Sequence, residues 1–158
     1  MGNNIKYLKS SAVDLAKLIT ALGDKASWSP LDKGRTALNQ VAECALMTGA
    51  CVGIIANKAV PNFDWEAFGK AQAELETDTS ALLAALADNT EALAAAIEGL
   101  SAEDAAFEVT MPWGETYTLA GLADVNYWNN TYHQGQINLI QQMVNDWHLP
   151  ELEKKLLA

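Results

Sequence analysis

The sequence predicts an all-α protein, a four-helix bundle with a small β-hairpin between the third and fourth helices. Apolar residues recur at steps of three and four along four long segments, which is the period of an amphipathic helix. One short β-prone stretch with a Pro-Trp-Gly turn signal interrupts them. The length of 158 residues and the hydrophobic content of 50% suffice for one core. We therefore expect a single domain over residues 1–158.

The first helix is predicted over residues 5–22, where the apolar side chains form one stripe. The Gly23-Asp24 pair is typical of a helix C-terminus. A loop with Trp28, Pro30 and Gly34 is expected to follow.

The second helix is predicted from about Leu31 to Asn57. Its apolar residues lie nearly all round the helix, which is typical of a buried helix. Glu43 is the single charged residue between Arg35 and Lys58. A lone carboxylate on such a helix needs a partner or loses its charge, so Glu43 becomes a candidate site residue.

Residues 58–69 are expected to form a connection, and residues 70–99 a third helix that the stretch 88–90 could kink or interrupt. The hairpin is predicted near residues 107–119. The fourth helix is predicted over residues 119–146, and a short amphipathic tail follows Pro150.

The charge balance narrows the range of partners. Asp and Glu outnumber Lys and Arg by 20 to 10, for a net charge of −10. Such a chain is poorly suited to nucleic acid or to an anionic membrane surface, which bind through Lys and Arg. The segment 44–56 is the longest weakly polar stretch, and we expect it to be too short for a membrane span. Two cysteines without a disulfide framework favour a reduced, cytoplasmic location.

The fourth helix carries polar residues where a core stripe is expected. One line along it, at steps of three and four, contains Leu122, Asn126, Asn129, His133, Gln136, Ile140, Met143 and Trp147. Buried polar groups must be paired. We therefore expect Glu43, Asn129 and His133 to meet inside the bundle, with Asn126 and Gln136 lining the same pocket.

Two interpretations of this cluster stay open. One is a set of buried hydrogen bonds that fixes the helix register, without a ligand. The other is a site for a divalent metal such as Zn²⁺, Ni²⁺ or Mn²⁺, because bundle cores often hold metals on facing helices. Trp113 is expected either to cover one end of the bundle or to wall the mouth of the pocket.

The stretch Asn129-Asn130-Thr131-Tyr132-His133-Gln134-Gly135-Gln136-Ile137 resembles the fourth-helix signature of the DinB/YfiT-like superfamily, His-x-x-x-His followed by x-Gly-Gln and an aliphatic residue. The lead-in over residues 119–128 and the second-helix segment 35–44 are also similar to the family. The resemblance implies an up-down-down-up bundle, often dimeric. It also implies a divalent metal bound by three histidines, one on the second helix and two on the fourth, and activity in the transfer of low-molecular-weight thiols or in thiol-dependent isomerisation.

The chain departs from this pattern at two of the three ligand positions. His133 is matched, whereas Glu43 and Asn129 stand where the family has histidines. We therefore expect weaker metal binding, or a metal-free site. Gly135 is matched and would let a neighbouring helix approach closely.

Three hypotheses follow from these residues. The first is a metal-dependent hydrolase or thiol transferase with a degenerate Glu43/Asn129/His133 site, whose catalytic residues the sequence does not identify. The second is a metal-free protein that binds a small molecule in the same cavity. The third is a structural dimer. A homodimer is expected because the second helix has more apolar surface than one bundle seam needs.

Overall fold

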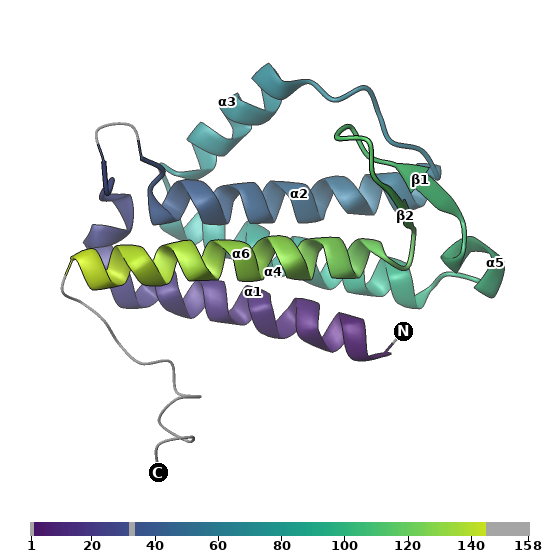
Figure 1. Ribbon diagram of the computed structural model, residues 1–158, viewed down its shortest axis with the longest axis horizontal. Coiled ribbons are helices and arrows are strands. Elements are labelled where there is room, and N and C mark those ends of the chain that lie inside the picture. Colours follow the sequence, from purple (N-terminus) through teal and green to yellow (C-terminus); the bar gives the residue numbers. More distant parts are fainter. Residues whose placement is uncertain (1, 32–33, 145–158) are drawn as a thin grey trace, which may run out of the picture.

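The computed structural model describes residues 2–31 and 34–144. Its elements follow in the order α1 (Gly2–Leu22), the 3₁₀ helix η1 (Gly23–Ser27), α2 (Ala37–Asn57), α3 (Trp65–Leu75), α4 (Thr79–Glu98), α5 (Ala102–Ala105), β1 (Glu108–Thr110), β2 (Thr116–Thr118) and α6 (Leu122–Met143). The four long helices α1, α2, α4 and α6 form the bundle (Figure 1). The predicted fold class is confirmed.

Contacts between the helices fix their directions. Ser11 of α1 accepts hydrogen bonds from both Asn130 and Gln134 of α6, and Asn4 near the start of α1 donates to Asp124 near the start of α6. These two helices therefore run parallel, side by side (Figure 1). The helices α2 and α4 also run in one direction, opposite to α1 and α6, so the course is up-down-down-up.

The boundaries of the first two helices follow from local chemistry. Gly23 takes a φ of 53°, a left-handed conformation that ends α1 where predicted. Thr36 caps α2, because its Oγ1 accepts from the backbone N–H of Asn39 at 3.0 Å. The predicted start of the second helix at Leu31 is therefore six residues too early.

The third predicted helix is two helices. Asp64 caps α3 through the N–H of Ala67 at 2.9 Å, inside the segment that was expected to be a connection. Asp78 caps α4 through the N–H of Ala81 at 3.0 Å and marks the break between them. The helix α4 then continues through residues 88–90, so the interruption expected there is wrong.

The hairpin is confirmed, and it precedes the α6 N-terminus. Val109 pairs with Tyr117 in the centre of an antiparallel two-stranded sheet. Gly114 turns the chain with a φ of 94°. The predicted end of the fourth helix, Trp147 on its stripe and the amphipathic tail lie outside the described residues.

The core has two apolar clusters separated by a polar layer. One cluster lies toward η1 and includes Leu15, Leu82 and Ile137. The other lies toward the hairpin and includes Leu93 and Leu122. Between them are polar side chains that are at most 3% exposed: Ser11, Gln40, Thr48, Thr90, Asn126, Asn130 and His133. The candidate site is part of this layer.

Two helices, Ala37–Asn57 and Thr79–Glu98, are long and apolar enough to cross a membrane by length and composition. The first of these helices contains the segment 44–56, which was expected to be too short for a span. In the bundle, 56% of the first apolar window and 33% of the second are buried inside the protein. Core helices pass the same test, so this finding is weak evidence for a span.

Candidate functional site

His133 lies at the centre of the site and is 2% exposed. Its Nδ1 is 3.1 Å from Gln40 Oε1 and 2.9 Å from Gln136 Oε1. Both partners are amide oxygens, so with the amides in this orientation Nδ1 carries a proton and donates it. The ring is thereby fixed, and its other nitrogen, Nε2, points at Glu43 Oε1 at a distance of 3.2 Å.

Glu43 is the partner that the sequence predicted for this histidine. Its side chain is 27% exposed, so it lies at the rim of the bundle rather than in the core. The second carboxylate oxygen lies 2.7 Å from Arg35 Nη2. The hydrogen bond from His133 and the charge of Arg35 hold the pKa of Glu43 below its ordinary value, although partial burial opposes this shift.

Asn129 lies on the same side of α6, one turn before His133, but its amide is engaged elsewhere. Its Nδ2 donates to the sulfur of Cys44 at 3.7 Å. Among the described residues, no hydrogen bond joins Asn129 to Glu43 or His133. The structure thus brings Glu43 and His133 together and leaves Asn129 beside them.

The three predicted pocket-lining residues have separate positions. Gln136 contacts His133 directly. Asn126 is buried two turns away, where it binds Thr48 Oγ1 at 3.0 Å and Cys51 Sγ at 3.2 Å. Trp113 lies in the hairpin turn and is 44% exposed. Within the described part of the chain, no hydrogen bond or ring contact joins Trp113 to Glu43 or His133.

The cluster also contains Arg35 and Gln40, which were not predicted from the sequence as site residues. Gln40 lies three residues before Glu43, on the same helical face, and this spacing was a usable signal. Arg35 precedes the α2 N-cap. Its contact with Glu43 depends on how the chain enters the helix, which apolar periodicity does not reveal.

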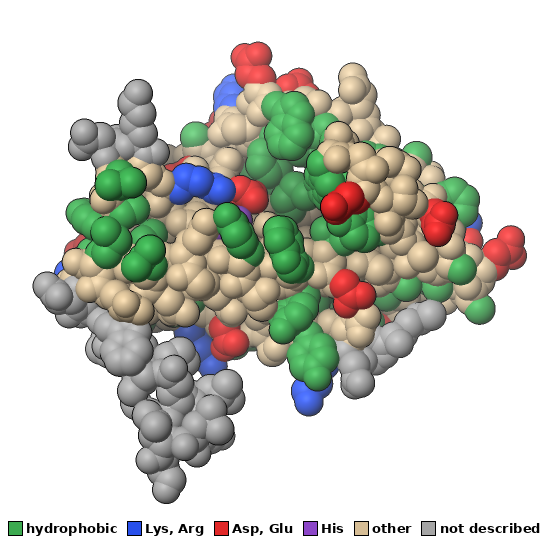
Figure 2. Space-filling view, in the orientation of Figure 1, with side chains coloured by type: hydrophobic (Ala, Val, Ile, Leu, Met, Phe, Trp, Pro, Cys, Tyr) green, Lys and Arg blue, Asp and Glu red, His purple; other side chains and the backbone are tan. Residues whose placement is uncertain are grey.

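A pair of exposed aromatic rings borders the site. Trp128 and Tyr132 stack with ring centroids 5.5 Å apart, and they are 64% and 52% exposed. Tyr132 also packs edge-on against the His133 ring at 5.2 Å. Figure 2 shows that hydrophobic side chains gather on this face beside a meeting of acidic and basic side chains.

The two cysteines are unsuited to nucleophilic chemistry. Cys44 and Cys51 are both fully buried. Burial raises the pKa of the Cys51 thiol to about 11 and raises that of Cys44 still further, with the nearby Glu43 charge adding to the effect. A thiol that stays protonated and inaccessible is not a reactive one.

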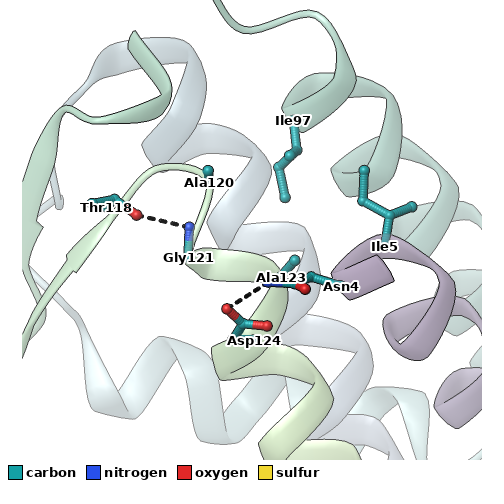
Figure 3. Close-up of a pocket in the computed structure, with 8 residues that line it drawn as sticks. All are labelled: Asn4, Ile5, Ile97, Thr118, Ala120, Gly121, Ala123 and Asp124. Carbon is teal, nitrogen blue, oxygen red and sulfur yellow. Dashed lines mark hydrogen bonds between the residues drawn. The ribbon is translucent and has the colours of Figure 1, made fainter. Parts of the chain in front are cut away.

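A separate cavity of about 160 Å³ lies between the start of α1 and the start of α6 (Figure 3). Asn4 donates to Asp124 at 2.9 Å across it, and Thr118 accepts from the backbone N–H of Gly121. Asp124 is nine residues from His133, roughly 13 Å along the helix. None of the predicted site residues lines this cavity.

The donor set fits a divalent metal poorly. Glu43, Asn129 and His133 are the residues that would hold one. Among the described residues, no group of three His, Cys, Asp or Glu side chains is placed to bind an ion together. The guanidinium of Arg35 already neutralises the Glu43 carboxylate, and Asn129 offers an amide, which is a weak ligand for Zn²⁺ or Ni²⁺.

No family model matches the sequence, and no curated protein matches it either. The fold is similar to that of YfiT from Bacillus subtilis, described as a probable metal-dependent hydrolase with an unusual four-helix bundle topology. That match has a TM-score of 0.78 and 17% identity, and it covers 93% of this chain and 88% of YfiT.

A second solved structure with a similar fold is the mycothiol-dependent maleylpyruvate isomerase. Here the TM-score is 0.69 at 14% identity, and the match covers 86% of this chain and 60% of the isomerase. Identities this low establish the fold alone. The predicted resemblance to the DinB/YfiT-like superfamily is therefore confirmed in the architecture: the chain has the four-helix-bundle fold of YfiT and of the mycothiol-dependent isomerase.

Proposed function

We propose that this chain is a small-molecule enzyme, a hydrolase or a low-molecular-weight thiol transferase, that acts at the Glu43–His133 pair. The observation that carries the proposal is the fixed His133 ring, anchored at Nδ1 by two amide oxygens and directed by Nε2 at a carboxylate. A ring held in this way exchanges a proton at one defined atom, as general acid–base catalysis requires. The fold is shared with a probable metal-dependent hydrolase and with a mycothiol-dependent isomerase, which supports the same class.

The pair has a clear chemical task in either reaction. In a hydrolysis, the pair would accept a proton from water as the water oxygen bonds to the substrate carbon, and would return that proton to the leaving alcohol or amine as the bond between carbon and leaving group breaks. In a thiol transfer, the pair would accept the proton of the incoming thiol as sulfur bonds to the substrate carbon, and would pass that proton to the group that leaves this carbon as its bond breaks. Because Cys44 and Cys51 are buried, that thiol would be a small molecule and not a side chain of the protein. The stacked Trp128 and Tyr132 would offer an apolar surface beside the pair.

The Arg35–Glu43 ion pair favours a second candidate, a metal-free protein that binds a small molecule without transforming it. Both oxygens of Glu43 are already engaged, one by Arg35 and one by His133. A carboxylate in this state accepts a further proton less readily. The cluster would then hold the helices in register beside a binding surface.

A ligand and activity screen tests the proposal. Untagged protein is screened by thermal shift against low-molecular-weight thiols and small acids, and by turnover of small esters and amides with and without thiol. We expect at least one compound to bind or react in the wild type and to lose at least tenfold in His133→Ala and Glu43→Gln. The matched control is Gln142→Ala, an exposed position on the same helix.

The outcomes separate the two candidates. Turnover that depends on His133 supports the enzyme, whereas binding that depends on His133 without turnover supports the binding protein. Compounds that act equally on wild type and His133→Ala would show that the site lies elsewhere.

A further inference from the structure

Arg35 places a fixed positive charge beside the two groups that would otherwise bind a metal. Its Nη2 lies 2.7 Å from Glu43 Oε2, and the other oxygen of the same carboxylate lies 3.2 Å from His133 Nε2. The carboxylate thus bridges a guanidinium and an imidazole. This bridge uses the oxygens that a divalent ion would need.

The guanidinium is positioned by more than its ion pair. Arg35 Nε donates to Asn39 Oδ1 at 2.5 Å, and its Nη2 lies 3.4 Å from the Asn39 carbonyl. Asn39 in turn donates its amide to the carboxylate of Glu76, in the break between α3 and α4. Gln72 of α3 donates to the Asn39 carbonyl at 2.8 Å. Arg35 is therefore held on one side by Asn39, which α3 and Glu76 support, and on the other side by Glu43.

We propose that Arg35 takes the place of a metal ion at this site: it supplies the positive charge next to Glu43 and His133 and keeps divalent cations out. A cation entering between Glu43 and His133 would meet a like charge within a few ångströms. It would also have to displace a guanidinium that makes hydrogen bonds to two residues. The chain thus keeps two potential metal ligands, Glu43 and His133, and its own arginine blocks access to them.

Metal titration of Arg35 variants tests this inference. Untagged, chelator-treated protein is titrated with Zn²⁺, Ni²⁺ and Mn²⁺ separately, by calorimetry and by equilibrium dialysis with metal analysis. We expect the wild type to bind these ions weakly, and Arg35→Ala to bind at least one of them tenfold or more tightly. The gain should vanish in Arg35→Ala/Glu43→Gln and in Arg35→Ala/His133→Ala.

Three controls make the result specific. Lys17→Ala removes an exposed lysine from α1, together with its ion pair to Asp14, and reports the effect of losing a positive charge that does not touch Glu43 or His133. Arg35→Gln is measured beside Arg35→Ala, so that the inference stays testable if one of them folds poorly by circular dichroism. Glu43→His/Asn129→His restores the three-histidine pattern and reports whether these positions converge on one ion.

The inference is overturned by any of three results. One is tight, stoichiometric binding of an ion by the wild type. Another is an affinity that Arg35→Ala and Arg35→Gln leave unchanged, and the third is an equal gain in Lys17→Ala. All of these readouts are independent of ligand binding and turnover, so they do not depend on the proposed function.

Discussion

Glu43 links the chemistry of the site to the stability of the fold. Its pKa is lowered from the ordinary value of 4.5 mainly by the hydrogen bond with His133 and by the charge of Arg35. The unfolded chain therefore binds this proton more readily than the folded one. The stabilisation is complete above about pH 4.5 and is lost as the pH falls through the lower folded-state pKa.

We predict that the free energy of unfolding of Glu43→Gln falls less between neutral and acid pH than that of the wild type. Because both ion-pair partners are partly exposed, the loss at neutral pH should be about 1 kcal/mol. Urea denaturation from pH 7 to pH 3 measures it, with the exposed Glu74→Gln as control. If the free energies of unfolding of wild type and Glu43→Gln differed by the same amount at every pH, the pKa of the Glu43 carboxyl would not change on folding, and the prediction would be wrong.

The residues of the site show what a single sequence can predict. The pairing of Glu43 with His133 followed from the lone charge on the second helix and the line of polar residues on the fourth, and the structure places the two side chains 3.2 Å apart. Their role as ligands or catalysts stays a prediction. Arg35 was not predicted to join them, because its contact depends on the loop geometry before α2. Asn129 was placed on the correct face, but helical spacing does not tell which way an amide turns.

At the scale of elements, the parallel helices α2 and α4 approach each other closely at one glycine, Gly49 of α2. A Cβ added at Gly49 would lie 2.8 Å from Asn89 Nδ2, and that nitrogen donates to the Ala45 carbonyl at 2.9 Å. The small residue therefore lets a side chain of one helix reach the backbone of the other. This hydrogen bond crosses the helix pair at the level where an interruption of α4 was expected.

We predict that Gly49→Ala and Asn89→Ala are strongly coupled. Replacing glycine by alanine in a helix interior raises the free energy of unfolding by about 1 kcal/mol. Where Asn89 is present, the clash with its side chain should cancel this gain. In the Asn89→Ala background the gain should appear, so the coupling free energy should be about 1 kcal/mol or more. Chemical denaturation of the four proteins measures it.

Gly53 supplies the control for this cycle. No atom lies within 4 Å of a Cβ added there, so Gly53→Ala should stabilise both backgrounds equally. Equal gains from Gly49→Ala with and without Asn89 would show that the asparagine moves aside at no cost.

The elements also show where periodicity misleads. The four bundle helices were predicted because each buries one apolar stripe in the core. The short helix α3 buries no residue fully, so its apolar residues lack the core position that the stripes of the bundle helices have. The start of α3 is marked by its N-cap Asp64, and the break after it by Asp78, the N-cap of α4. The prediction followed the apolar spacing over residues 70–99 and therefore missed both caps.

At the scale of the whole molecule, a homodimer, a single domain and a cytoplasmic location stay predictions. The dimer was expected through the second helix, but α4, α6 and α3 cover most of α2 within the chain.

The exposed apolar stripe lies on α6, at Trp128, Tyr132, Leu139 and Met143. Gly135 lies within it, and no atom of the described chain comes within 4 Å of an added Cβ. The helix expected to approach Gly135 is therefore not one of the described helices of the same chain.

We predict that a second copy packs on the part of this stripe formed by Gly135, Leu139 and Met143, and that Leu139→Glu shifts the protein to monomer. The charge would be buried without a partner at the centre of the interface. Sedimentation velocity over a concentration series measures the shift, and Val13→Glu on the exposed side of α1 is the control. A wild type that sediments as a monomer at every concentration would contradict the prediction.

The parallel contact between α1 and α6 has a consequence for how the protein is made. Ser11 bonds to Asn130 and to Gln134, which are 119 and 123 residues later in the chain. At about 5–20 residues per second, a ribosome needs roughly 6–24 s to travel that distance. During this time the apolar stripe of α1 cannot pack against α6. The bundle can therefore be completed only after the last helix has been synthesised. A nascent chain halted before residue 122 should therefore expose α1 to chaperones and proteases, although it already contains three of the four bundle helices.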